Sequence, residues 1–104
     1  MFRRRRFGDL IDRQLRVFAE DHSERLAQIT QTRATYRDSD TNEAEQRYGD
    51  YADELEWAAE ELMEMRDTYA ATLDGAATER YLHEFRRTVE KALPAIASAL
   101  DLPD

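Results

Sequence analysis

The chain has 104 residues, no cysteine and a formal net charge of −8. A chain of this length can bury a core as one domain, and the absence of cysteine excludes disulfides, thiol chemistry and cysteine-zinc sites and favours a reducing, cytoplasmic location. Three glycines and two prolines among many Ala, Glu, Arg and Leu residues favour an all-α fold.

The charge is distributed unevenly. Residues 1–37 hold nine arginines against five acidic residues, a net charge of +4, whereas residues 38–67 hold twelve acidic residues against two arginines, a net charge of −10. Residues 68–104 have a net charge of −2. The acidic middle repels phosphate groups, so we expect no nucleic-acid binding. A basic protein is the partner that this charge favours.

No targeting or membrane segment is expected. The opening "MFRRRRFGDLIDRQL" is basic, but mixed charge follows it where a signal peptide needs an apolar stretch of roughly 7 to 15 residues. The longest apolar run, "ALPAIASAL", is far shorter than the roughly 18 residues of a membrane span. The sequence therefore predicts a soluble protein without a transmembrane segment.

The first predicted elements are a basic arm over residues 1–8 and a helix over residues 9–36, with Asp9 as its N-cap. Apolar or amphipathic side chains recur along this helix at steps of three and four residues, from Phe7 to Tyr36. Three states are open for Arg3 to Arg6: a solvated arm, an arm docked on acidic residues, or a contact with an anionic membrane or nucleic acid.

A polar break, "RDSDTNEAE", precedes the second predicted helix over residues 41–73. Its apolar stripe keeps alternating steps of four and three residues, which suits packing against an antiparallel neighbour. A third helix is predicted over 76–93, and a short terminal helix over 94–101 follows Pro94, which kinks or ends the third helix. These elements predict an all-α single domain: an antiparallel three-helix bundle, formed by a long helical hairpin and a third helix kinked near Pro94.

The predicted hairpin is longer than its third helix, so part of it stays uncovered. The uncovered part lies near the first turn and carries an aromatic and apolar group, Ile29, Tyr36, Tyr48 and Tyr51. Tyrosine is common at protein interfaces, where its ring can be partly buried while its hydroxyl remains exposed to solvent. Either the tail after Pro94 folds over this group or a second copy does, and we predict a homodimer.

Trp57 is the unusual residue of the second helix. Helical spacing places it away from the apolar stripe, among the acidic residues Asp53, Glu54, Glu60, Glu61 and Glu64. One interpretation is that the indole lies flat across its own helix or contacts the third helix. The other is that Trp57 and these acidic residues bind a partner, because a tryptophan surrounded by charge is typical of a binding hot spot.

A metal-dependent activity is the alternative hypothesis. "EELME", from Glu60 to Glu64, resembles the E-E-x-x-E half of the motif of MazG-like all-α nucleoside triphosphate pyrophosphohydrolases, which implies Mg²⁺ held against phosphates. The second half of that motif, E-x-x-D on the next helix, is missing: no aspartate lies three positions after Glu79, Glu84 or Glu90. Glu64 and Asp67 have this spacing but share a turn with the first half.

The remaining residues predict no catalytic group, metal ligand or cofactor. Neither histidine has the Glu-x-x-His spacing of a di-metal helical bundle, since Ala19 and Arg80 stand three positions before His22 and His83. His22 falls on the apolar stripe, as a core histidine does, and His83 projects outward among charges. The sequence therefore favours a non-enzymatic protein interaction or structural module, with a metal-responsive module as a further alternative.

Overall fold

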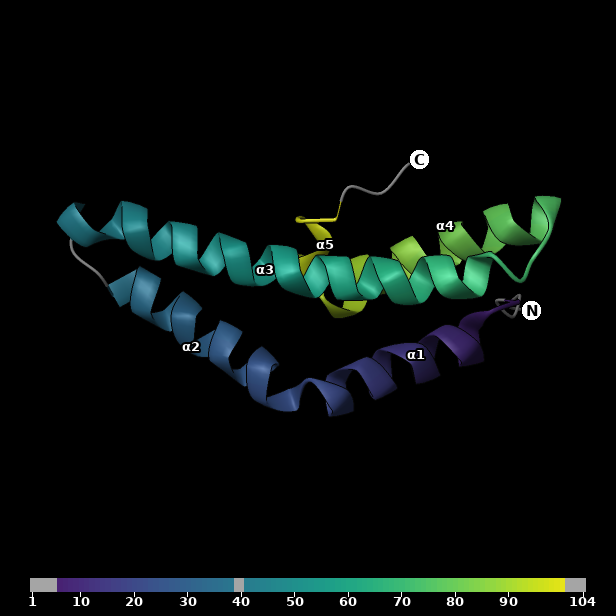
Figure 1. The fold of residues 1–104 in the computed structure, drawn as a ribbon, viewed down its shortest axis with the longest axis horizontal. Coiled ribbons are helices and arrows are strands. Elements are labelled where there is room, and N and C mark those ends of the chain that lie inside the picture. Colours follow the sequence, from purple (N-terminus) through teal and green to yellow (C-terminus); the bar gives the residue numbers. More distant parts are fainter. Residues whose placement is uncertain (1–5, 39–40, 101–104) are drawn as a thin grey trace, which may run out of the picture.

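A computed structural model of the chain describes residues 6–38 and 41–100. It consists of the helices α1 (Gly8–Asp21), α2 (Ser23–Asp38), α3 (Thr41–Ala70), α4 (Gly75–Ala92) and α5 (Pro94–Ala97), shown in Figure 1. Within these residues there is no strand, which confirms the predicted all-α class.

The helix expected over residues 9–36 is instead two helices, separated at His22. Asp21, His22 and Ser23 are three successive residues of low helix propensity, so the backbone bends there at little cost. The amide of His22 still donates to the carbonyl oxygen of Phe18 at 3.1 Å, and the amide of Leu26 donates to that of His22 at 2.9 Å. The bend lets α1 pack mainly on α4 while α2 packs along α3.

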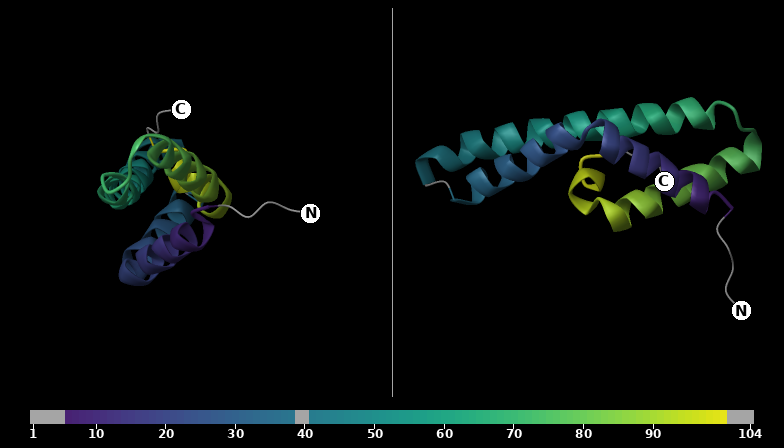
Figure 2. Two further views of the ribbon diagram at one scale, coloured as in Figure 1. Left: turned by 90° about the vertical axis from the view of Figure 1, so that its right-hand side faces the viewer. Right: turned by 90° about the horizontal axis from the view of Figure 1, so that it is seen from below.

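The expected antiparallel three-helix bundle is not confirmed, because the described part of the chain holds five helices and the first predicted one is bent. The end-on view in Figure 2 separates three groups, which are α1 with α2, α3, and α4 with α5. The molecule is elongated, with extents of 50 × 28 × 23 Å. In Figure 1, α4 and α5 accompany α3 over about half of its length, so α2 and the start of α3 project as a two-helix arm.

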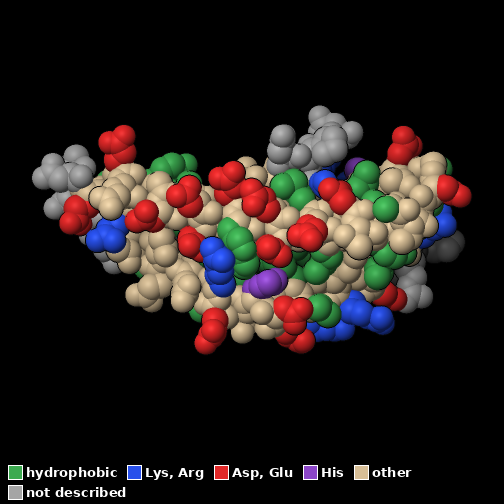
Figure 3. All heavy atoms as spheres, viewed as in Figure 1, with side chains coloured by type: hydrophobic (Ala, Val, Ile, Leu, Met, Phe, Trp, Pro, Cys, Tyr) green, Lys and Arg blue, Asp and Glu red, His purple; other side chains and the backbone are tan. Residues whose placement is uncertain are grey.

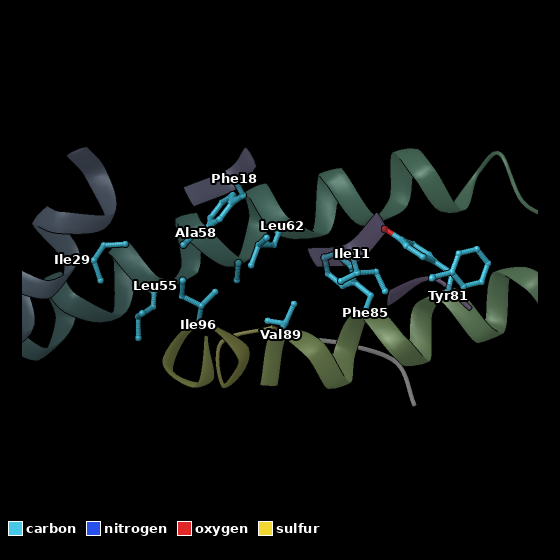
Figure 4. Packing of buried hydrophobic residues seen from close by; sticks show 12 residues of the cluster. Ile11, Phe18, Ile29, Leu55, Ala58, Leu62, Tyr81, Phe85, Val89 and Ile96 are labelled. Carbon is cyan, nitrogen blue, oxygen red and sulfur yellow. The ribbon is translucent and has the colours of Figure 1, made fainter. Parts of the chain in front are cut away.

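The core is one apolar cluster to which every helix contributes (Figure 4). Its fully buried large side chains are Ile11, Phe18, Leu62, Tyr81, Phe85 and Val89. Small Ala58 and Ala59 are also buried on α3, where they let the surrounding helices approach closely.

The tail after Pro94 packs onto the middle of α3. Pro94 begins α5, a position that tolerates proline because the first helical amide has no partner within the helix. Ile96 is buried and lies beside Leu55 in Figure 4. The helix expected over 94–101 ends at Ala97, and residue 101 lies outside the described residues.

The other boundaries differ slightly from those predicted. α1 begins at Gly8, which leaves Asp9 in the first turn and makes Phe7 the residue that precedes the helix. α3 ends at Ala70, and α4 begins at Gly75, whose φ of +32° lies in the region that glycine tolerates best. Of the predicted basic arm, residues 1–5 lie outside the described residues.

A buried carboxylate fixes the start of α1. The amide of Phe7 donates to Glu84 Oε1 at 3.0 Å, and Arg80 Nε donates to Glu84 Oε2 at 3.0 Å. The ring of Phe7 meets those of Tyr69 and Tyr81 edge to face, with centroids 6.4 and 5.5 Å away. α1 is thus held on α4 by a charged acceptor and by aromatic packing.

Across the described residues, none of the helices combines the length and apolar character that crossing a membrane requires.

Candidate interaction groove

An open groove runs between α1 and the C-terminal half of α3. One wall is Gln14 and Phe18 of α1 with His22 at the bend, and the other is Glu61, Glu64, Met65, Thr68 and Tyr69 of α3 with Thr72 of the following turn. Because the chain changes its packing partner at His22, α1 lies on α4 rather than directly on α3, and this part of α3 keeps one side uncovered. We call this feature the α1–α3 groove.

The floor of the α1–α3 groove is apolar and firmly supported. Phe18 is buried, and Met65 and Tyr69 are half-buried against the core. Beneath them the hydroxyl of Tyr81 donates to Gln14 Oε1 at 3.0 Å. Burial of the Tyr81 ring raises the pKa of its hydroxyl to about 12. The floor of the α1–α3 groove is therefore continuous with the core.

The rim of the α1–α3 groove is acidic on the α3 side. Glu64 is exposed and Glu61 is half-buried, and both line the groove. Glu60 and Asp53 are exposed nearby on α3, with Glu60 one turn before Glu64. Figure 3 shows hydrophobic side chains in the band between α3 and α1, with acidic side chains beside them. This combination attracts a ligand that is both apolar and basic.

An exposed apolar residue adjoins the opposite wall. Val17 is 40% exposed and is one of two large hydrophobic residues that are exposed within the described residues. It follows Gln14 by three positions on α1 and so shares a face with it. Val17 lies outside the lining of the α1–α3 groove and adds an exposed apolar side chain on this face of α1.

Helical spacing placed Trp57 away from the apolar stripe, but its side chain does not point away from the other helices. The indole is half-buried against the core, between α3 and the junction of α1 with α2. The His22 ring meets it edge to face, with centroids 5.2 Å apart and planes at 85°. The prediction failed because it gave α3 one narrow buried stripe, whereas α2 and the bend at His22 pack against a second side of this helix.

The guanidinium of Arg25 covers one face of the Trp57 ring. The guanidinium carbon lies 3.9 Å from the centroid of the indole ring, and Arg25 Nε donates to Glu54 Oε2 at 3.2 Å. Glu54, expected as part of a partner-binding surface with Trp57, therefore has an intramolecular partner. Of the predicted acidic residues, Glu61 and Glu64 are the two that line the α1–α3 groove.

The structure brings together the three tyrosines predicted near the first turn. The ring centroid of Tyr36 lies 5.4 Å from that of Tyr48 and 6.4 Å from that of Tyr51, which it stacks at an interplanar angle of 7°. Tyr48 is 54% exposed. Ile29, expected at the same surface, is instead buried in the core. We call Tyr36, Tyr48 and Tyr51 the tyrosine cluster.

A second depression, which is larger and more enclosed than the α1–α3 groove, follows α4. It is lined by residues of both charges, which include Arg80, Glu84, Arg87, Glu90 and Lys91. Two ion pairs at helical spacing lie in it, Arg80 with Glu84 and Arg86 with Glu90. This mixture of charges selects no particular class of ligand.

The carboxylates of the half motif from Glu60 to Glu64 lie along one helix. Among residues 6–38 and 41–100, no group of three or more His, Asp or Glu side chains is placed to hold a metal ion. His22 contacts the aromatic rings of Phe18 and Trp57, and His83 is exposed on α4.

Sequence reasoning missed the α1–α3 groove because it assigned the residues of the groove floor to helix packing. Phe18, Met65 and Tyr69 all fall on apolar stripes. Such stripes do not specify which part of α3 the neighbouring helices leave uncovered. The run of Asp21, His22 and Ser23 was the available signal, since a bend there directs α1 away from α3. Arg25 and Glu84 carried no pattern that singled them out.

Comparison with protein-family models, with curated proteins and with solved structures finds no match to this chain. Inference about function therefore depends on the geometry and chemistry of the described residues.

Proposed function

We propose that this protein is a non-catalytic, cytoplasmic interaction module that binds a basic amphipathic helix of a partner protein in its α1–α3 groove. The observation that supports the proposal most directly is the joining of an apolar floor, formed by Phe18, Met65 and Tyr69, to a carboxylate rim, formed by Glu61 and Glu64. Binding of a helix in a groove depends on apolar anchors spaced along one helix face, and charge at the rim sets the partner's orientation.

The dimensions of the α1–α3 groove suit this ligand. Its wall on α3 runs from Glu61 to Tyr69, which at 1.5 Å per residue is about 12 Å or a little over two helical turns. A docked helix of that length presents two or three apolar side chains on one face. Its basic flank would face the acidic stretch over residues 38–67, whose net charge is −10.

Charge also favours interaction over catalysis at this groove. An active site needs polar groups that converge on a reacting atom, whereas the carboxylates here stand at the rim of an apolar floor. The divalent-metal-dependent alternatives, a nucleotide pyrophosphohydrolase or a metal-responsive module, would need a cluster of ligands. Among the residues that the structure describes, Glu60, Glu61 and Glu64 form no such cluster.

Peptide binding tests the proposal. A fluorescently labelled helical peptide with leucines at i, i+3, i+4 and i+7 and arginines elsewhere should bind at least about tenfold more tightly than the same peptide with glutamates in place of the arginines. The double variant Glu61→Lys with Glu64→Lys should weaken binding of the basic peptide by about tenfold, because it inverts the charge of the rim. Fluorescence anisotropy measures both affinities.

The matched control is Glu45→Lys with Asp50→Lys. Both residues are exposed on α3 outside the α1–α3 groove, so this variant changes the net charge equally. We expect it to weaken binding less than twofold at 0.15 M salt, where distant surface charges are largely screened. Equal binding of the two peptides, or an equal loss in the two double variants, would contradict a specific groove.

Self-association through the tyrosine cluster is a second candidate function. The supporting observation is that Tyr48 is 54% exposed on the arm formed by α2 and the start of α3, beyond the part that α4 and α5 accompany in Figure 1. Exposed aromatic rings backed by other rings are typical of interface anchors. We therefore propose a homodimer in which the tyrosine clusters of two copies meet.

Light scattering tests the homodimer. We expect a dimer mass at high micromolar concentration and at least a tenfold larger dimer dissociation constant for Tyr48→Ser, because a central aromatic anchor contributes about 2 kcal/mol. Val17→Ser is the control, since it removes the other exposed large hydrophobic residue and should leave the mass unchanged. A monomer mass for the unaltered protein would refute the proposal, and loss of the dimer in Val17→Ser alone would move the contact to the α1–α3 groove.

A further inference from the structure

The covered face of Trp57 and the carboxylate of Glu54 together contact one guanidinium group. The Arg25 guanidinium carbon lies 3.9 Å from the indole centroid, within the range of a cation–π contact, and Arg25 Nε lies 3.2 Å from Glu54 Oε2. Glu54 and Trp57 are three residues apart and so present their side chains on one face of α3. An aromatic plane beside a carboxylate matches the flat, hydrogen-bonding guanidinium better than any other side chain.

The ion pair of Arg25 with Glu54 is partly exposed to water. The side chain of Arg25 is 45% exposed and that of Glu54 is 31% exposed, so water screens their attraction. Pairs of this kind add at most about 1 kcal/mol to stability. Trp57 and Glu54 belong to α3, whereas Arg25 comes from α2, so the two α3 residues can receive a guanidinium from another source.

These contacts lie at one end of the α1–α3 groove. His22 lines the groove and also packs edge to face on Trp57, with ring centroids 5.2 Å apart. A helix that lies in the groove and extends past His22 therefore reaches Trp57 next. The charge there is also suitable, since the exposed carboxylate of Asp53 lies one turn before Trp57.

We propose that Trp57 and Glu54 form an arginine-binding site, occupied by Arg25 in the free protein and by an arginine of the partner helix in the complex. The inference rests on the proposed helix-binding function and names the residue that the partner supplies. A lysine would not replace this arginine, because its compact and strongly hydrated ammonium lacks the planar surface that stacks on an indole.

The sole tryptophan of the chain allows a direct test of the arginine site. In the Arg25→Ala variant the site is vacated, and titration with N-acetyl-L-arginine amide should change the Trp57 emission with saturation. N-acetyl-L-lysine amide should need at least about fivefold higher concentration for the same change, a difference of about 1 kcal/mol. The unaltered protein should also respond to the arginine compound at higher concentration, because Arg25 competes.

Two further variants control this titration. Arg25→Ala combined with Glu54→Gln should lose most of the response, because the carboxylate is removed while Trp57 stays. Arg33→Ala removes an exposed arginine elsewhere on α2 and should behave as the unaltered protein. A response that never saturates, or equal responses to the arginine and lysine compounds, would overturn the proposal.

The peptide assay separates this inference from the proposed function. Arg25→Ala should tighten binding of the arginine-containing basic peptide by about threefold to fivefold and leave binding of a version with lysines unchanged. Unchanged or weaker binding of the arginine peptide would show that Arg25 is structural, while the helix-binding function stands. Failure of every peptide to bind, with a saturable response to the arginine compound, would leave an arginine site without a helix-binding groove.

Discussion

Replacing Glu84 by alanine is expected to lower the free energy of unfolding by about 2–4 kcal/mol. The side chain of Glu84 is buried and accepts hydrogen bonds from the amide of Phe7 and from Arg80 Nε, both at 3.0 Å. Without the carboxylate the buried Phe7 amide has lost its acceptor, which costs about 1–3 kcal/mol, and the charged bond to Arg80 is lost as well. Urea unfolding followed by circular dichroism measures the difference.

Two variants on the same helix show whether the acceptor is the cause. Glu90→Ala removes an exposed carboxylate that is paired with Arg86 at 3.7 Å, and it should change stability by at most about 0.5 kcal/mol. Glu84→Gln keeps an oxygen acceptor and should recover at least half of the loss seen in Glu84→Ala. Similar losses for Glu84→Ala and Glu90→Ala would mean that the bond to Phe7 contributes little to holding α1 on α4.

The second large expected effect is a fall in the free energy of unfolding at alkaline pH, caused by ionisation of the Tyr81 hydroxyl. Burial raises the pKa of this hydroxyl to about 12 from the ordinary value of 10.0, so the folded protein keeps a proton that the unfolded chain releases. The contribution of Tyr81 to stability is therefore fully present below pH 10 and is lost as the pH rises towards 12. A shift of two pKa units corresponds to about 2.7 kcal/mol in the free energy of unfolding, and about 1.4 kcal/mol of this is lost by pH 11.

Tyr81→Phe isolates this contribution from those of other groups that titrate in the same range. The variant keeps the buried ring and removes the ionisable hydroxyl that donates to Gln14. We expect urea unfolding of the unaltered protein to lose about 1.4 kcal/mol more than Tyr81→Phe between pH 9 and pH 11. Parallel pH profiles for the two proteins would show that the Tyr81 hydroxyl reaches water in the folded state.

The sequence was sufficient to predict the helical class. Alternating steps of three and four between apolar residues, the polar break before Thr41 and the proline at position 94 each have a direct physical meaning for the backbone. The bend at His22 could not be predicted in the same way. The apolar stripe continues through His22 to Leu26, so the periodicity alone is that of one unbroken helix.

The candidate site could be predicted only in part for the same reason. Helical spacing placed Trp57 off the main stripe and beside acidic residues. Whether that side of α3 is open depends on the course of α1 and α2, which is a tertiary property. The bend covers Trp57 with His22 and Arg25 and opens the surface further along α3, at Met65 and Tyr69.

The two-helix arm affects the order in which parts of the molecule unfold locally. Among the α2 residues whose side chains the structure describes, Ile29 is the one buried in the core, whereas the other half of the molecule holds Ile11, Phe18, Tyr81 and Phe85. Resistance to local opening follows the density of such contacts, so the arm should open well before the half that contains the α1–α3 groove. A partner bound at Met65 and Tyr69 would thus contact the more stable half of the molecule. The arm that carries the tyrosine cluster would open and close locally without disturbing that partner.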